Sequence, residues 1–126
     1  MLNVLKFIKN CMTDIELPYC FMRWGKKHLA DPYYVGEISQ VPLSTEDGAE
    51  EYAFILTGFT RGDWAELLTD QETIKKKFPS VDGLTAILED GSSVAVFYSS
   101  SLLLNFENED VKRVQHNIQI KLWKAV

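Results

Sequence analysis

The segment from Tyr52 to Thr60 constrains the fold more than any other part of the chain, because it alternates like a strand and is apolar on both faces. The alternation places two sets of side chains on opposite faces: Tyr52, Phe54 and Leu56 on one, and Ala53, Ile55, Thr57 and Phe59 on the other. Such a strand is typical of the centre of a sheet with both faces buried. We therefore expect a central strand that is covered twice, or covered once and buried by an assembly partner.

The chain before this segment predicts one short helix and two strands. Apolar residues recur at helical spacing in residues 2–12, which predicts an amphipathic helix that ends before Pro18. Aromatic and β-branched residues predict strands from Tyr19 to Trp24 and from Tyr33 to Val41, with a polar turn at residues 25–28 between them. Residues 42–48 are rich in turn-forming side chains, so we expect a loop there.

The chain after this segment predicts the main helix and the remaining strands. Helical spacing runs from Asp63 to Phe78, with Thr60 or Asp63 as the N-cap and three lysines near the negative end of the dipole. The turn at residues 89–92 predicts a hairpin of residues 84–88 and 93–98, and residues 99–104 extend it or begin a further strand. Residues 114–123 predict a final amphipathic strand. The order of the predicted elements, a helix, strands, a second helix and further strands, indicates a single α+β domain over residues 1–126 with a mainly antiparallel sheet.

Composition and charge exclude several classes of protein. The 126 residues are 46% hydrophobic and 25% charged, the ordinary globular mixture. The longest apolar runs are far too short to cross a membrane, and the N-terminus lacks the pattern of a signal peptide, so we expect a cytoplasmic protein. In that reducing compartment Cys11 and Cys20 are expected to be free thiols. The net charge of −5 argues against a nucleic-acid-binding domain.

The acidic residues gather at two places in the later part of the chain. Residues 1–30 carry five basic and two acidic side chains, whereas residues 31–126 carry eight basic and sixteen acidic ones. Such clusters are solvated loops, or a surface that faces a partner or a pore. The many aromatic residues of the strands form an aromatic-rich core, or their outward-facing members, such as Trp123, line a subunit contact. The candidate interaction surface therefore consists of Glu46, Asp47, Glu50, Glu51, Glu107, Glu109, Asp110 and Trp123.

Residues with catalytic or metal-binding potential are few. The sequence contains none of the common nucleotide-binding, hydrolase or metal-binding motifs. His28 and His116 lie at no ligand spacing from another histidine or cysteine, and His116 belongs to the apolar face of the final strand, which favours a core histidine. Nothing local supports a dyad of Cys20 and His28. We expect no metal, no cofactor and no enzymatic activity, although a deep pocket with a pKa-shifted histidine or carboxylate would favour an enzyme.

Three segments resemble one known family. The stretch from Pro32 to Gly48, with a Pro-Tyr strand and a polar Thr-x-Asp-Gly loop, resembles a region of the tail terminator, or tail-completion, proteins of long-tailed bacteriophages. In these proteins a strand then leads into a helix, as Tyr52–Phe59 leads into residues 63–78 here, and the last strand is similar to Gln115–Trp123. The short N-terminal helix and the strand at residues 19–24 depart from this pattern. The early part of the chain is therefore also compatible with a neighbouring head-tail joining family.

This resemblance implies a structural role. It implies an α+β protomer that forms a homo-oligomeric ring, often a hexamer, which caps the tail tube, stops its polymerisation and docks to the head connector. The protein would lie in the host cytoplasm during assembly and then in the virion, with no specific nucleic-acid or membrane partner, and its acidic loops would face the DNA passage. The alternative is a small acidic protein-binding module, such as an immunity protein that blocks a basic toxin.

Overall fold

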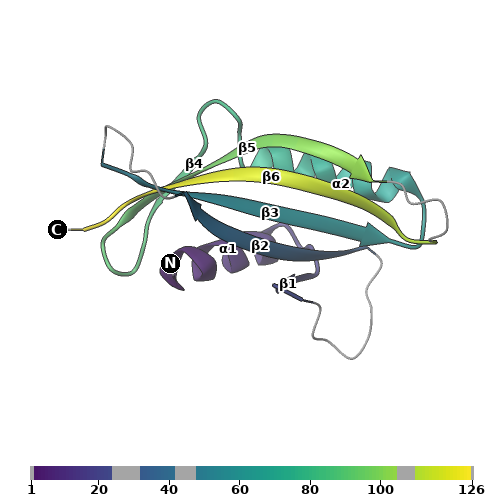
Figure 1. Cartoon of the computed structure of the whole chain (residues 1–126), viewed down its shortest axis with the longest axis horizontal. Helices are drawn as coiled ribbons and strands as arrows, with labels where there is room; N and C mark the ends of the chain where they lie inside the picture. The colour runs from purple at the N-terminus through teal and green to yellow at the C-terminus, as the bar shows by residue number, and fades with distance from the viewer. Residues whose placement is uncertain (1, 24–31, 42–47, 105–109, 126) are drawn as a thin grey trace.

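The computed structural model describes residues 2–23, 32–41, 48–104 and 110–125 and has the expected α+β fold (Figure 1). The described chain forms α1 (Leu2–Asp14), β1 (Tyr19–Phe21), β2 (Tyr33–Val41), β3 (Glu50–Thr60), α2 (Trp64–Lys77), β4 (Leu84–Ile87), β5 (Ser93–Leu104) and β6 (Lys112–Trp123). The strands make one sheet in the order β1-β2-β3-β6-β5-β4. Neighbouring strands are antiparallel except β1 and β2, which are parallel, so the predicted mainly antiparallel sheet is confirmed.

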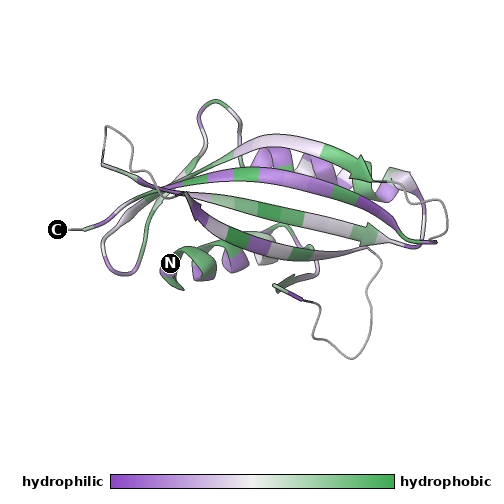
Figure 2. Ribbon diagram, in the orientation of Figure 1, coloured by the Kyte–Doolittle hydropathy of each residue, from purple (hydrophilic) through white to green (hydrophobic). Residues whose placement is uncertain are grey.

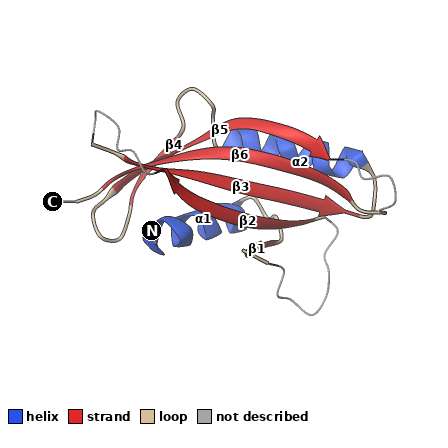
Figure 3. Ribbon diagram, viewed as in Figure 1, coloured by secondary structure: helices blue, strands red, loops and turns tan. Residues whose placement is uncertain are grey.

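Both helices pack on the same face of the sheet, which we call the helix face (Figure 3). The buried side of α1, including Ile8, and that of α2, including Ile74, share one hydrophobic core with alternate residues of the strands. Hydropathy alternates along the long strands accordingly (Figure 2). The strand residues of that core are Tyr34, Tyr52, Phe54, Leu56, Val94, Val96, Tyr98, Val114, Ile118, Ile120 and Leu122.

Strand β3 is central, as predicted, and the helices cover one of its two apolar faces. It pairs with β2 on one side and β6 on the other. Tyr52, Phe54 and Leu56 are buried on the helix face, whereas Ala53 is exposed and Ile55 is half-buried on the other face. No described helix covers this second face, which we call the open face. The described helices therefore cover β3 on one face only, and burial of the other face by an assembly partner stays a prediction.

The ends of several elements differ from the sequence prediction for local reasons. Helix α1 continues to Asp14, and β1 ends at Phe21 because Met22 adopts a positive φ of 69°. The N-cap of α2 is Asp63, whose carboxylate accepts a hydrogen bond from the Ala65 amide. The open question about residues 99–104 is also answered, since they extend β5 after a register shift between Tyr98 and Ser100. The predicted turn at 25–28 and most of the loop at 42–48 lie outside the described residues.

Gly58 of β3 and Tyr34 of β2 are in close contact on the helix face. The two residues are opposite each other in the β2–β3 register, and the ring of Tyr34 lies over Gly58. A β-carbon on Gly58 would lie 2.5 Å from Cε1 of Tyr34, well inside van der Waals contact. The Tyr34 hydroxyl donates a 2.7 Å hydrogen bond to Asp70 of α2, so the ring joins the sheet to the helix and has little freedom to move.

We expect Gly58→Ala to lower the free energy of unfolding by about 1–3 kcal/mol, the usual cost of adding a methyl group to a packed core. Urea denaturation followed by circular dichroism measures this change. Ser39→Ala is a matched control, because Ser39 is exposed on the neighbouring strand, and it should change stability by less than about 0.5 kcal/mol. Equal stability of the Gly58→Ala variant and the native protein would contradict the packing described here.

Candidate functional site: the open face of the sheet

The open face presents a mixed polar and apolar surface across the central strands. It combines aliphatic and aromatic side chains with amides and with charges of both signs, a composition typical of protein contact surfaces. Most of its side chains are half-buried or exposed, in contrast to the opposite face. The strand register assigns to it Val35, Glu37 and Ser39 of β2, Ala53, Ile55, Thr57 and Phe59 of β3, and Arg113, Gln115, Asn117, Gln119 and Lys121 of β6.

One end of the open face carries an aromatic and cationic row. Tyr33, Phe59, Arg113 and Leu104 are successive partners across β2, β3, β6 and β5. The rings of Tyr33 and Phe59 stack with centroids 4.9 Å apart, and the guanidinium of Arg113 lies 5.5 Å from the Phe59 centroid. Leu102, near Leu104 on β5, is 53% exposed. Tyrosine, phenylalanine and arginine are the residue types enriched at protein interfaces, so this row is suited to a protein partner.

The centre of the open face contains a shallow hollow of about 210 Å³. Its lining includes Ala53 and Ile55 of β3, Asn117 and Gln119 of β6, and Ser99 at the irregularity in β5. The Asn117 amide donates a hydrogen bond of 3.1 Å to the Ser100 hydroxyl. The volume is below the usual range of pockets that bury a small-molecule ligand, and it is better matched to one or two side chains of a neighbouring protein.

The described acidic residues of the predicted interaction surface do not form one patch. Glu50 and Glu51 begin β3, whereas Asp110 lies just before β6, whose first residue pairs with the last residue of β3. The 11 residues of β3 therefore separate the two groups by about 30 Å, at a rise of about 3.3 Å per residue. Glu50 and Glu51 thus lie at the opposite end of the sheet from Asp110, and the role of these residues in an interaction stays a prediction. Glu46, Asp47, Glu107 and Glu109 lie outside the described residues.

Lysines compensate the acidic group at the start of β3. Lys124 Nζ lies 2.9 Å from Glu50, and Lys121 Nζ lies 4.0 Å from Glu51. The Tyr52 hydroxyl also donates a 2.7 Å hydrogen bond to Glu50, and this bond and Lys124 lower the pKa of the Glu50 carboxyl. Trp123, predicted to face outward, is half-buried opposite Ser93 on the open-face side. Its role at a subunit contact stays a prediction.

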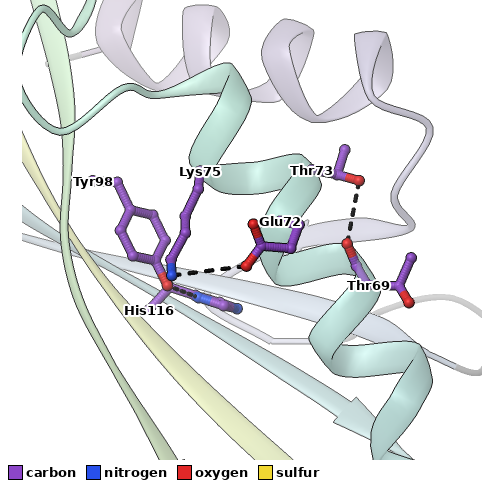
Figure 4. Close-up of polar contacts among 6 residues, drawn as sticks. All are labelled: Thr69, Glu72, Thr73, Lys75, Tyr98 and His116. Carbon is purple, nitrogen blue, oxygen red and sulfur yellow. Dashed lines mark hydrogen bonds and ion pairs between the residues drawn. The ribbon is translucent and has the colours of Figure 1, made fainter.

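The predicted core position of His116 is confirmed, and the residue lies on the helix face beneath α2 (Figure 4). Its side chain is fully buried, and Nδ1 shares a 2.6 Å hydrogen bond with the Tyr98 hydroxyl. No hydrogen-bond partner among the described residues meets Nε2. Burial, with a smaller contribution from Lys75, lowers the pKa of His116 to about 4, so the ring is neutral at physiological pH. The histidine is thus part of the core that supports the open face from behind.

The described residues also bear on metal, membrane and disulfide chemistry. Within them, no three side chains of histidine, cysteine, aspartate or glutamate gather closely enough to hold a metal ion. Neither α1 nor α2 is long and apolar enough to span a membrane. Cys11 and Cys20 are free, as expected, and burial raises the pKa of the Cys11 thiol to about 11. The expected lack of a metal, a cofactor and enzymatic activity stays a prediction.

Comparison with known proteins finds a likeness of fold and none of sequence. No family model matches the chain, and no curated protein matches it. Among solved structures, a chain from the virion of a native gene transfer agent particle has a TM-score of 0.59 with 10% sequence identity. The match covers 90% of this chain and 84% of that one. This protein shares its fold with a virion chain. At such low identity the likeness establishes the fold alone.

The row of Tyr33, Phe59, Arg113 and Leu104 is the part of the site that sequence reasoning missed. Tyr33, Phe59 and Leu104 occupy a predicted strand or its extension and Arg113 directly precedes one, but the row exists only through the pairing of four strands. The available signal was the second apolar face of residues 52–60, which includes Phe59. That signal indicated that this face of the strand is apolar, but it did not show which residues of the neighbouring strands lie beside Phe59.

We expect the free energy of unfolding to fall as the pH drops from about 6.5 to about 4. A histidine in the unfolded chain has a pKa near 6.5, whereas the pKa of the buried His116 is about 4. Between these pH values the unfolded chain binds a proton at His116 and the folded protein does not, which favours unfolding. The stability that depends on the neutral ring is complete above about pH 6.5, and about 3 kcal/mol of it is lost by about pH 4. Urea denaturation across this pH range measures the slope.

A double variant, His116→Leu with Tyr98→Phe, supplies the control for this slope. It removes the titrating ring and the hydroxyl that would otherwise lose its partner, while it keeps the volume of the core nearly unchanged. Its stability should depend less on pH between 4 and 6.5 than that of the native protein. Parallel slopes for the two proteins would mean that other titrating groups, and not His116, produce the acid sensitivity.

Proposed function

We propose that this protein is a structural protein of a phage-like particle and acts as a tail terminator, a ring that caps the tail tube and docks to the head connector. The observation that carries the proposal is a sheet whose helices cover one face only, in a fold similar to that of a gene transfer agent virion chain. The resemblance of three sequence segments to tail terminator proteins supports the same role. The chain would assemble in the host cytoplasm and remain in the virion.

The open face supplies the physical reason for assembly. Residues such as Ile55 and Phe59 keep apolar area in contact with solvent, and the stacked aromatic row adds flat, rigid contact surface. Burial of apolar area is the main favourable term in protein association. A neighbouring chain of the particle, such as the tail-tube protein, would bury this face, as the apolar pattern of residues 52–60 anticipates.

A closed ring needs unlike contact surfaces on each protomer, because its contacts run head to tail. The described chain offers such asymmetry, since its helices lie on one side of the sheet and the open face on the other. The two acidic groups at opposite ends of the sheet are proposed to repel DNA where they border the passage. The lysines beside Glu50 and Glu51 weaken this effect at one of the two ends.

The test is the mass of the purified protein by light scattering, alone and with the tail-tube protein of the same particle. A ring with several copies of the 14.4 kDa chain, visible by negative-stain electron microscopy, is the expected result. A monomer that stays monomeric with the tube protein would overturn the proposal. Tight one-to-one capture of a basic protein would instead favour an immunity-type binding module.

We expect Ala53→Arg to leave the protomer folded and to weaken its binding to the tail-tube protein at least tenfold. Ala53 is exposed at the centre of the open face, so a long charged side chain there fits the free protomer but obstructs a closely packed neighbour. Thr69→Arg is the matched control, because Thr69 is exposed on α2, on the helix side of the sheet. Equal binding by both variants would show that the open face is not the contact.

A further inference from the structure

A groove between α1 and β1 lies away from the open face and has a chemistry of its own. Its volume is about 630 Å³, three times that of the hollow in the open face. Four of its lining side chains are apolar or aromatic: Leu2 and Leu5 from α1, and Tyr19 and Phe21 from β1. Leu2 is 68% exposed and Phe21 is 39% exposed, so apolar area remains in contact with solvent here.

The polar lining of the groove is cationic. Lys6 and Lys9 of α1 and Arg23 beyond β1 border it, and none of the described lining residues is acidic. This corner thus keeps the positive balance that the first thirty residues have in the sequence. In addition, β1 is a sheet edge whose pairing partner among the described residues is β2 alone. The groove therefore offers apolar area, positive charge and a strand edge with no described partner beyond β2, a combination that suits an acidic edge strand.

The other edge of the same sheet, formed by β4, has the complementary chemistry. Within the described part of the chain β4 pairs with β5 alone, so its outer side has no strand partner among the described residues. Val81, which precedes β4, is 88% exposed, and Ile87 at its end is 71% exposed. Asp82 and Glu89 flank the strand and are exposed, and residues 80–91 contain no basic side chain. The β4 edge is apolar and acidic, whereas the groove is apolar and basic.

The protomer cannot bring these two surfaces together by itself. Leu2, Leu5 and Lys9 line the groove, whereas Asn3, Phe7 and Asn10 of the same helix line a small cavity with Ile87, Leu88 and Glu89 at the end of β4. Lys6 borders both. At 100° per residue these two sets point to different sides of α1, with the buried residues Val4 and Ile8 between them facing the sheet. The body of α1 thus lies between the apolar part of the groove and the chain's own β4 edge, with Lys6 at the boundary, so the acidic edge that fits the groove is that of a second copy.

We propose that the β4 edge of one copy docks in the α1–β1 groove of the next and forms the contact between copies of this chain. Val81 or Ile87 enters the apolar part of the groove, Asp82 and Glu89 face Lys9 and Arg23, and the strand edges of the two copies come side by side. The two surfaces differ, so the contact is head to tail and closes into a ring under the right rotation. This inference rests on the proposed ring and specifies which surfaces build it.

The test uses two charge-reversed variants and their mixture. One variant carries Lys9→Glu and Arg23→Glu in the groove, and the other carries Asp82→Lys and Glu89→Lys at the β4 edge. Each variant alone brings like charges together and should elute as a 14.4 kDa monomer at a concentration where the native protein is a ring. In a one-to-one mixture each reversed groove meets a reversed edge and each native groove a native edge, so the native mass should return.

Control measurements separate the possible failures. Circular dichroism shows that each variant is folded, and Lys76→Glu, an exposed lysine on α2, should leave the ring intact. If the native protein forms rings and the reversed variants do so equally, or if the folded variants fail to assemble when mixed, the docking inference is wrong and the ring proposal survives. A native protein that is monomeric alone and with the tail-tube protein overturns the ring proposal and this contact with it.

Discussion

The antiparallel pairing of β3 with β6 is the interaction on which the rest of the structure depends. It runs from Glu50 opposite Leu122 to Thr60 opposite Lys112, through the middle of the sheet. This register places Phe54 beside Ile118 and Leu56 beside His116 on the helix face, where α2 packs over them. A slip by one residue would turn these side chains to the open face. Burial of the core side chains therefore stabilises this register over the alternatives, and only this register brings those side chains together.

The same pairing explains why the protein presents an uncovered face. With two helices available and both needed to bury the aromatic helix face, the described chain has no further helix for the other side. The uncovered face accordingly mixes apolar and polar side chains, with Ile55 opposite Asn117 and Phe59 opposite Arg113. Such a surface tolerates water in the free protomer and still gains from burial by a neighbour, which is the behaviour expected of a part in a larger assembly.

Local sequence signals predicted most elements because each depends on a few neighbouring residues. The Asp63 cap, the helical spacing that follows it and the Asp90-Gly91 turn are of this kind, and all three are present. The end of β1 at Phe21 was missed because it depends on the unusual positive φ of Met22. The two acidic clusters were identified from composition, which carries no information on distance, so their placement at the two ends of β3 came only from the sheet.

The sequence by itself determined the fold class, the core position of His116 and the two apolar faces of residues 52–60, because alternation and spacing are properties of a single strand or helix. Only the tertiary structure decided which of those faces the helices cover, that Glu50 and Asp110 lie at opposite ends, and that α1 separates a basic groove from an acidic edge. These features arise from pairing between distant segments, which long-range packing selects and no local pattern encodes.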